Sequence, residues 1–426
     1  MTVKKEKKVK SHQTIFIQIA AYRDPQLLPT IRDCIKHSKH PDRLRFGIAW
    51  QHNDNDKWDN LDEFINDPRF KIIDIDYRDS RGVCYARNLV QSLYQNETYT
   101  LQLDSHHRFA PNWDDTLVSM LKSLQRKGFP KPLITAYIPS FNPENDPKER
   151  VLEPWKMTFD RFIPEGAIFF LPSSFESHEL KEPMPARFYS GHFAFSLGKF
   201  AKEVRHDPNY YFHGEEINVG VRAFTHGYDL FYPNKVVCWH EYTRRGRTKQ
   251  WDDDPIWTAR NDACHLRNRK LFEMDGLKND VDFGPYGFGK VRTLFQYEKY
   301  SGICFEDRAI SQDCIAHKIP NMGLTQLSRA KFKKNLCSLF KHCIDIGYDQ
   351  VPEKDYDLWC VAFKDDLGND MFRQDASPEE IENMRKDPDG YYKIWRSFET
   401  KKKPTSWLVW PHSIKKGWSD PITGNI

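Results

Sequence analysis

The sequence predicts an α/β protein with a mostly parallel sheet, followed by a small β-rich module. Three observations support this fold class. Short apolar runs alternate with segments of helical periodicity over the first 140 residues or so. No internal repeat interrupts this alternation, which is typical of parallel strands joined by helices. The end of the chain holds only short strand-like runs. Its 426 residues, 39% of them hydrophobic, suffice for two domains or for one large domain with an appendage.

The elements follow one another in a regular order. The near-continuous apolar run 14–21 is typical of a strand that is buried on both faces. Apolar residues at helical spacing then predict a helix from Pro25 to Ile35. Further strands are predicted at 44–50, 70–75, 99–103 and around 132–138, and further helices at 82–93 and 113–124.

The second half is less regular. Proline and glycine separate short apolar pieces from about 150 to 240, with a helix predicted at 216–226 and one or two short strands at 230–239. Residues 347–357 are rich in proline, aspartate and lysine and indicate a boundary, beyond which strands are predicted at 358–363, 391–398 and 407–409. We therefore expect a flexible basic tail at 1–13, a main domain at 14–310, a helical connector at 311–350 and the β-rich module at 351–426.

Composition excludes several classes of protein. The mean hydropathy of −0.74 is too polar for an integral membrane protein, and no apolar run approaches the ~20 residues of a membrane-spanning helix. A net charge of +4 argues against a general nucleic-acid binder. Aromatic residues make up 14% of the chain, far too many for a disordered protein.

Cysteine usage indicates a reducing compartment. The nine cysteines are odd in number and show no Cys-x-x-Cys spacing. The lysines of the N-terminal tail are not followed by an apolar signal segment. We therefore expect reduced thiols and a cytoplasmic location.

The sharpest chemical feature is Asp104-Ser-His106, directly after the predicted strand 99–103. Ligands bind beyond the carboxyl ends of parallel strands. An aspartate and a histidine two residues apart can reach one divalent cation, and this oxygen and imidazole ligation suits Mn²⁺. The alternative is that Asp104 caps a turn and that His106 and His107 are exposed at the surface.

An anion site is predicted upstream of this motif. Gly82 opens a predicted helix that carries Arg87 and follows Arg81. A helix N-terminus with flanking arginines is suited to bind a diphosphate. An ordinary capped helix is the alternative, and the strand that ends in Asp-x-His directly afterwards favours the anion site.

These motifs, in this order, resemble a nucleotide-sugar-dependent glycosyltransferase of the GT-A fold, in which the sheet is mixed and mostly parallel. More narrowly, the segments Ile17–Asp24, Leu103–Phe109 and Tyr286–Arg292 resemble the polypeptide N-acetylglucosaminyltransferase family. Its best-known members modify hydroxyproline, and it is related to the mucin-type polypeptide GalNAc transferases. The resemblance covers residues 14–310 and is weak beyond them.

The resemblance implies a retaining transfer from a UDP-sugar, with GlcNAc as the expected sugar, to a hydroxyl group of a protein. It implies Mn²⁺ or Mg²⁺ as the metal and His240 as a third ligand beside Asp104 and His106. The metal would neutralise the diphosphate and stabilise the leaving UDP. The sequence offers no convincing nucleophile, so we favour front-face attack, in which the leaving phosphate deprotonates the acceptor.

The resemblance also points to residues around the donor. Gly191 and His192 suit a sugar face, and either Glu215 or Glu216 is expected to hydrogen-bond a sugar or acceptor hydroxyl. Successive helical residues point about 100° apart, so only one of the two glutamates should reach the sugar; a helix-capping pair is the alternative. The donor-binding residues are expected to be Ala21, Tyr22, Arg23, Gln51, Arg81, Arg87, Asp104 and Gly191.

The segment 239–257 carries Arg244, Arg245 and Arg247. It is expected either to close over UDP, where an arginine would share the charge of the diphosphate, or to be a plain exposed loop.

Two other functions stay open at this stage. One alternative is the same chemistry on a saccharide acceptor in surface-polysaccharide synthesis, and the other is an inactive GT-A module that binds carbohydrate or protein. An inactive module would be expected to lack metal ligands, yet Asp104, His106 and His240 are all present. The sequence does not specify the oligomeric state or the role of the C-terminal module.

Overall fold

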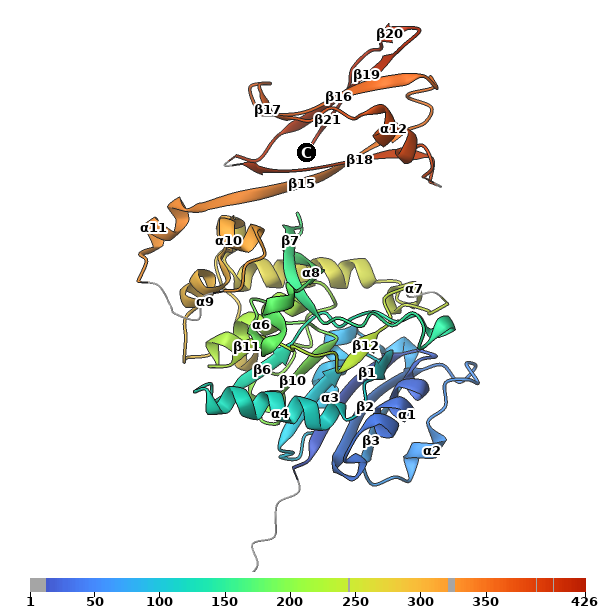
Figure 1. Ribbon diagram of the computed structural model, residues 1–426, viewed down its shortest axis with the longest axis vertical. Coiled ribbons are helices and arrows are strands. Elements are labelled where there is room, and N and C mark those ends of the chain that lie inside the picture. Colours follow the sequence, from blue (N-terminus) through green and yellow to red (C-terminus); the bar gives the residue numbers. More distant parts are fainter. Residues whose placement is uncertain (1–12, 244–245, 321–325, 388, 401) are drawn as a thin grey trace, which may run out of the picture. The chain divides into compact units, whose positions relative to one another are not determined.

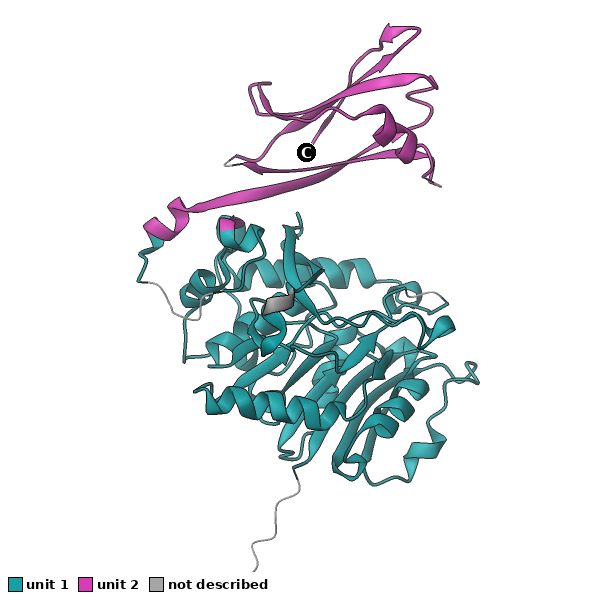
Figure 2. Cartoon of the chain, in the orientation of Figure 1, with its two compact units in different colours: residues 1–307, 313–329 teal, residues 308–312, 330–426 magenta. Residues whose placement is uncertain are grey.

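The computed structural model describes residues 13–243, 246–320, 326–387, 389–400 and 402–426 (Figure 1). The chain forms two compact units (Figure 2). The first comprises Met1–Asp307 and Asp313–Arg329, and the second comprises Arg308–Gln312 and Ala330–Ile426. The expected basic tail at 1–13 lies almost wholly outside the described residues. Within the described ranges, no helix combines the length and apolar character needed to cross a bilayer.

An eight-stranded mixed sheet forms the centre of the first unit (Figure 1). The first four strands in spatial order pair in parallel, as do β6 and β11, whereas β10 and β9 run antiparallel to their neighbours. The predicted mixed, mostly parallel sheet is thus confirmed. The spatial order is β3 (Phe70–Asp76), β2 (Leu44–His52), β1 (Ile15–Tyr22), β4 (Tyr99–Leu103), β10 (Phe193–Leu197), β6 (Pro132–Thr135), β11 (Asp229–Tyr232) and β9 (Met184–Pro185).

Helices cover both faces of this sheet. Alternate residues of β1 point to opposite faces, so Ile17 and Ile19 pack in the core cluster that contains apolar residues of α1 (Leu27–His37) and α4 (Trp113–Arg126). Phe16 instead packs with residues of α3 (Val83–Gln91). Each such apolar side chain contributes about 1.5–3 kcal/mol when fully buried, so the sheet is stabilised from both faces.

Smaller elements complete the first unit. Two antiparallel pairs, β7 with β8 and β5 with β12, stand apart from the main sheet. Their bounds are Trp155–Phe162 (β7), Ile168–Ser174 (β8), His107–Phe109 (β5) and Cys238–His240 (β12). The other elements are α2 (Asp62–Ile65), α5 (Phe200–Glu203), α6 (Glu215–Thr225), α7 (Gln250–Asp253), α8 (Trp257–Leu271), α9 (Leu294–Ser301), β13 (Ile303–Cys304) and α10 (Gln312–Ile315).

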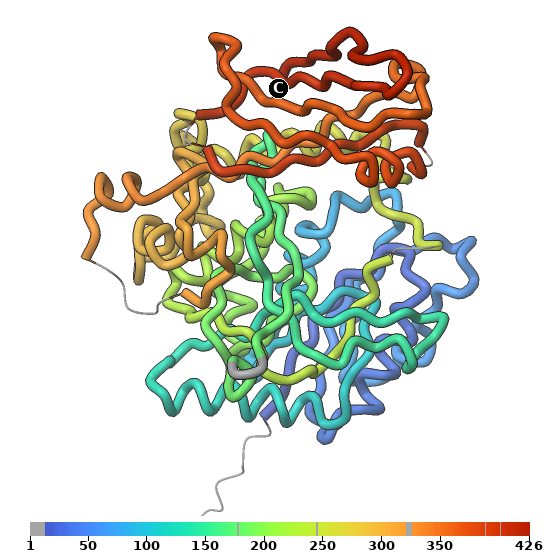
Figure 3. Tube along the Cα trace, turned by 45° about the horizontal axis from the view of Figure 1, so that its top comes forward, coloured from blue at the N-terminus to red at the C-terminus, as the bar shows by residue number. Residues whose placement is uncertain are grey.

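The second unit is β-rich, as predicted, and Figure 3 follows its chain from β15 in orange to β21 in red. It has its own core, which includes Ile344, Trp359, Phe363 and Val409. Its strands are β14 (Ala309–Ser311), β15 (Leu336–Gly347), β16 (Tyr356–Lys364), β17 (Asp370–Arg373), β18 (Tyr391–Thr400), β19 (Ser406–Ser413), β20 (Gly417–Trp418) and β21 (Ile422–Asn425), with helices α11 (Arg329–Lys334) and α12 (Pro378–Met384).

One segment differs from the expectation. Residues 311–350 were expected to form a helical connector, but β15 occupies Leu336–Gly347 and pairs antiparallel with β18 over ten residues. The physical reason is the burial of Ile344 and Ile346, two residues apart, against the apolar core of the second unit. Among the described residues of this segment, only the short helices α10 and α11 match the expectation.

Candidate functional site

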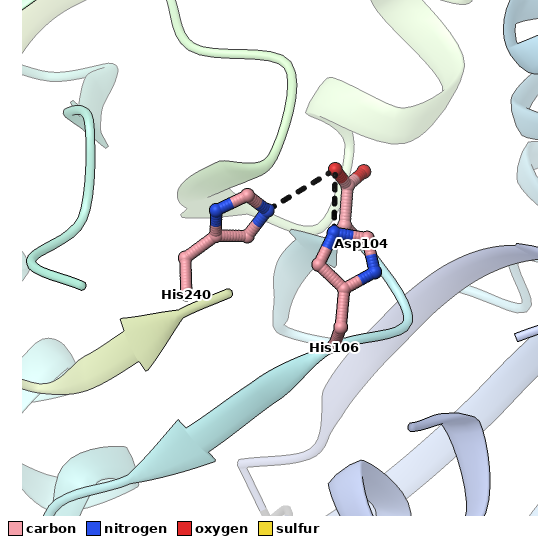
Figure 4. Close-up of side chains that lie close together, drawn as sticks. All are labelled: Asp104, His106 and His240. Atoms are coloured by element: carbon pink, nitrogen blue, oxygen red, sulfur yellow. Dashed lines mark ion pairs between the residues drawn. The ribbon is translucent and has the colours of Figure 1, made fainter. Parts of the chain in front are cut away.

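The carboxyl end of β4 carries the site that the sequence indicated. Asp104 and His106 lie in the turn that joins β4 to β5, and His240 is the last residue of β12. The antiparallel pairing of β12 with β5 places His240 opposite His107. Two short strands therefore bring His240 next to residues that are far away in the sequence (Figure 4).

The three expected ligands converge in space. One donor atom from each of Asp104, His106 and His240 lies within 4.8 Å of the other two. Oδ2 of Asp104 lies 3.4 Å from Nε2 of His240 and 3.7 Å from Nε2 of His106 (Figure 4). The alternative, in which Asp104 caps a turn and His106 and His107 are exposed at the surface, does not fit, because His107 is buried and the His106 side chain is only 12% exposed.

The cluster fits a divalent cation by its own chemistry. Both ring nitrogens of His240 are buried, and neither makes a hydrogen bond of normal geometry with the described residues. A buried polar atom without such a partner costs free energy. A cation between Nε2 of His240 and Oδ2 of Asp104 would satisfy both atoms, and a carboxylate with two imidazoles suits Mn²⁺.

Arg87 sets the charge of Asp104. The Arg87 side chain is 5% exposed, and its Nη2 lies 2.5 Å from Oδ1 of Asp104. Burial alone would raise the pKa of Asp104, but the Arg87 guanidinium and the nearby histidines outweigh it and lower that pKa well below its usual range. Asp104 is therefore ionised, with Oδ1 on Arg87 and Oδ2 facing the histidines.

His107, His192 and His240 are neutral imidazoles. Burial is the main cause that lowers the pKa of His107, His192 and His240 well below the usual histidine value. A neutral imidazole keeps the lone pair that a metal requires. The His192 ring stacks on His240, with centroids 4.2 Å apart. Both His192 nitrogens have protein partners, the Ile138 amide at 3.1 Å and the Ser190 hydroxyl at 3.2 Å.

A second carboxylate, Asp24, lies behind His106. Its Oδ2 is 2.7 Å from Nδ1 of His106 and accepts hydrogen bonds from Oγ of Ser105 at 2.6 Å and from Nη1 of Arg247 at 3.0 Å. Sequence reasoning quoted Asp24 within a motif but gave it no role. Its position was a usable signal, because it follows β1, the parallel neighbour of β4.

The two glutamates at the start of α6 have different partners. Glu215 makes an ion pair with Arg87, and its Oε1 lies 2.7 Å from Nε2 of His206. Burial alone would raise the pKa of Glu215, but Arg87 and His206 outweigh it and lower that pKa. The fold thus keeps Glu215 as an ionised carboxylate against Arg87.

Glu216 points to another set of partners. Its Oε1 accepts a hydrogen bond from the Gly191 amide at 2.9 Å, and its Oε2 accepts one from the Tyr137 hydroxyl at 3.0 Å. Burial, with the charge of Glu215 as a further cause, raises the pKa of Glu216 to about 8. Gly191 also lies close to Arg87: a Cβ added there would lie 3.0 Å from Nη1 of Arg87.

Four of the expected donor-binding residues lie at or just after the adjacent ends of β1 and β2, namely Ala21, Tyr22, Arg23 and Gln51. The Tyr22 hydroxyl donates to Asp253 of α7 at 2.7 Å, and Arg23 makes ion pairs with Asp56 and Asp253, both at 2.8 Å. Burial is the first cause that raises the pKa of Tyr22, and the Asp253 carboxylate adds to it. These two side chains therefore contact the segment that follows His240.

Gln51 and Arg81, two other expected donor-binding residues, differ in burial: Gln51 is buried and Arg81 is exposed. The Gln51 amide is buried, donates to the Ala21 carbonyl at 3.0 Å and accepts from the Ser80 hydroxyl at 2.7 Å. Arg81 is exposed, with its guanidinium 5.2 Å from the centre of the Tyr85 ring. Arg87 is thus the arginine of this helix region that contacts Asp104. Two of the arginines expected near the diphosphate, Arg244 and Arg245, lie outside the described residues.

Comparison with known proteins identifies the first unit. The family model described as Glycosyltransferase (GlcNAc) matches residues 14–67 and 59–307, more than half of the chain. No curated protein matches the sequence.

Several solved structures resemble the fold at low identity. Against GalNAc-T7 with UDP, GalNAc and Mn²⁺ the identity is 13% and the TM-score 0.47, over 94% of this chain and 70% of that chain. Against S. aureus TarS 1–349 in complex with UDP-GlcNAc the identity is 9% and the TM-score 0.35, over 63% of this chain and 76% of that chain. Against the mannosyltransferase PcManGT from Pyrobaculum calidifontis in complex with GDP-Man and Mn²⁺ the identity is 14% and the TM-score 0.37, over 64% of this chain and 66% of that chain.

Proposed function

The chain belongs to the glycosyltransferase (GlcNAc) family, and from that premise we propose that it transfers GlcNAc from UDP-GlcNAc to a hydroxyl group of a protein. The observation that carries the proposal is the convergence of Asp104, His106 and His240 at the carboxyl edge of the sheet. A divalent cation, Mn²⁺ or Mg²⁺, is proposed to bind there. When bound, it supplies positive charge to the diphosphate and stabilises the leaving UDP.

The protein adds its own charge beside this site. Arg87 is buried and contacts both Asp104 and Glu215. Its guanidinium is held in place before any ligand arrives, so it needs little reorganisation to stabilise negative charge on the departing phosphate. We propose Arg87 as the donor-binding arginine and place Arg81 at the exposed rim.

Glu216 is the better candidate for contact with a sugar or acceptor hydroxyl. Glu215 contacts Arg87 and His206, whereas the hydrogen-bond donors to Glu216 in the described part of the chain are the neutral groups of Gly191 and Tyr137. The Gly191 amide and the Glu216 carboxyl then form one polar wall of the sugar site. His192 is proposed to support His240 by stacking rather than to transfer a proton.

Retention of configuration is proposed to follow from front-face attack. Both glutamates at the start of α6 already have partners on their carboxylate oxygens, which argues against either one as a free nucleophile. The acceptor oxygen forms the new bond to C1 on the face from which UDP leaves. Its proton passes to the departing phosphate oxygen as the C1–O bond breaks.

Ala21, Tyr22, Arg23 and Gln51 are proposed as the uridine site at the ends of β1 and β2. Gln51 would act by fixing the backbone of Ala21, since its amide already binds that carbonyl. The proposed compartment is the cytoplasm, because no disulfide joins any of the nine cysteines, all of which the structure describes.

The test is UDP release from UDP-GlcNAc by the purified full chain, with and without Mn²⁺ and with candidate acceptors. We expect metal-dependent turnover that Asp104→Ala abolishes and Asp115→Asn retains. Asp115 is a carboxylate of α4 whose side chain is 45% exposed and pairs with Lys39. Peptides with serine, threonine or hydroxyproline should accept the sugar. Turnover with saccharides alone would overturn the protein acceptor, and no turnover with any UDP-sugar and metal would overturn the whole proposal.

A further inference from the structure

We propose that Asp24 is a positioning residue that fixes the tautomer of His106, so that Nε2 of His106 is free to bind a cation. The inference rests on the proposed function, because it concerns the same metal site. It adds a residue to which neither the motif nor the family match assigns a role. It is based on the observation that Asp24 and Arg247 both contact Nδ1 of His106, and only one of them can form a hydrogen bond with it in a given tautomer.

The fold fixes the approach of Asp24 to His106. β1 and β4 are parallel neighbours, with Ile19 opposite Leu103. Asp24 follows β1 and His106 follows β4 at the same edge of the sheet, so that Oδ2 of Asp24 lies 2.7 Å from Nδ1 of His106. The opposite ring nitrogen, Nε2, faces Oδ2 of Asp104 at 3.7 Å. The imidazole is thus held between two carboxylates, one on each nitrogen.

Arg247 contacts the same Nδ1. Its Nη1 lies against Nδ1 of His106 and within 3.0 Å of Oδ2 of Asp24. A neutral imidazole carries its proton on one nitrogen only. If Nδ1 donates to Asp24, then Nε2 keeps its lone pair. If Nδ1 accepts from Arg247, the proton must sit on Nε2, which then cannot bind a cation.

The surroundings favour the bond to Asp24. A carboxylate can only accept, so it requires a donor at Nδ1, and Asp24 is 4% exposed, where a charge-assisted hydrogen bond is strong. Arg247 does not need His106 as a hydrogen-bond acceptor, because its Nη2 lies 2.8 Å from Oε2 of Glu241 and its Nη1 donates to Oδ2 of Asp24. The Ser105 hydroxyl donates to the same Asp24 oxygen and holds the carboxylate in place.

The consequence is that Nε2 of His106 already has a free lone pair toward the cation site before the cation binds. Carboxylates that bind the outer nitrogen of a metal-ligating histidine typically account for a 10- to 100-fold change in metal affinity or activity when they are mutated. Asp24→Asn is the most informative change, because the amide NH₂ of asparagine can donate to Nδ1. It would place the proton on Nε2, where the cation should bind.

The experiment uses the full chain labelled with ¹⁵N-histidine and freed of metal. Long-range ¹H–¹⁵N spectra report which nitrogen of His106 carries the proton, with the His106 signals assigned by their loss in His106→Gln. We expect the proton on Nδ1 in the wild type and on Nε2 in Asp24→Asn. Mn²⁺ titration followed by electron paramagnetic resonance should show at least a tenfold weaker affinity for Asp24→Asn, and no change for Asp115→Asn.

Each outcome decides the inference. A proton on Nε2 in the metal-free wild type would overturn it and assign Nδ1 to Arg247; this measurement needs no variant, so it stands even if Asp24→Asn fails to fold. An Asp24→Asn variant that keeps both the wild-type tautomer and the wild-type Mn²⁺ affinity would also overturn it. If the wild type binds no Mn²⁺, the proposed function fails, whereas the tautomer measurement still decides the role of Asp24.

Discussion

Nη2 of Arg87 lies 2.5 Å from Oδ1 of Asp104, on the side of the carboxylate opposite to the histidines. The two oxygens of Asp104 therefore have different partners: Oδ1 binds the permanently charged Arg87, and Oδ2 faces His106 and His240. Because Arg87 also contacts Glu215, one buried guanidinium joins the metal site to the start of α6. The sites proposed for the cation and for the sugar are therefore coupled through Arg87.

Removal of Arg87 should cost stability as well as activity. Arg87→Ala leaves Asp104 and Glu215 without their cation, and an uncompensated buried charge typically costs 3–5 kcal/mol. We expect the free energy of unfolding, measured with urea, to fall by about that amount. An unchanged unfolding curve would show that the two carboxylates do not depend on Arg87.

Arg87→Lys separates charge from geometry. Lysine keeps the positive charge but cannot offer the two nitrogens with which Arg87 reaches Asp104 and Glu215 together. We expect a folded protein, judged by its thermal unfolding, with kcat for UDP release reduced about 10- to 100-fold. Full activity in Arg87→Lys would mean that charge alone matters at this position.

Glu216 should give the stability a measurable pH dependence. Its pKa is about 8 in the folded chain and near 4.5 ordinarily. Between these values the folded state holds a proton that the unfolded state has lost, so the contribution of Glu216 to stability is full below pH 4.5 and disappears as the pH rises through 8. Each pKa unit corresponds to about 1.4 kcal/mol.

Glu216→Gln is the matched variant for this effect. Glutamine is neutral at every pH, and its altered hydrogen bonds to Gly191 and Tyr137 cost the same throughout the range. The free energy of unfolding of the variant, relative to that of the wild type, should therefore rise steadily from pH 4.5 to pH 8. A difference that stays constant over this range would refute the raised pKa.

Gly191 should tolerate no side chain. A Cβ at this position would lie 3.0 Å from Nη1 of Arg87 and 3.3 Å from Oε2 of Glu215, closer than ordinary packing. We expect Gly191→Ala to displace Arg87 and to lower kcat at least tenfold while the protein stays folded. Gly287→Ala is the control, since a Cβ there would meet nothing closer than 3.7 Å. Equal activity of the two variants would contradict the close approach.

The fold was largely predictable because its signals are local. The run 14–21 is almost continuously apolar because β1 is covered by helices on both faces, and the helical periodicities of α1, α3 and α4 reflect one buried side each. The strand β15 was missed because Leu336–Gly347 mixes apolar, charged and cysteine residues, and its strand state depends on pairing with β18 some fifty residues later. Such pairing leaves no local signal.

The site was predictable where its residues are close together in the sequence, as in Asp104-Ser-His106. The convergence of His240 with these residues is an observation of the structure, since the sequence alone implied it only through a family resemblance. The sequence did not distinguish the partners of Glu215 from those of Glu216, because the difference depends on Arg87 and His206 contacting Glu215. Sequence reasoning missed the contact of Asp24 with His106, because that contact depends on the register of β1 against β4.

The central claim is that Asp104, His106 and His240 form one divalent-cation site, and direct titration of the metal-free chain with Mn²⁺ tests it. Electron paramagnetic resonance counts the free ion, so it yields both the stoichiometry and the affinity. The account predicts one Mn²⁺ per chain in the wild type and none in His240→Ala, whose folding is confirmed by an unchanged circular dichroism spectrum. Saturable binding of equal affinity in the wild type and in His240→Ala would contradict it.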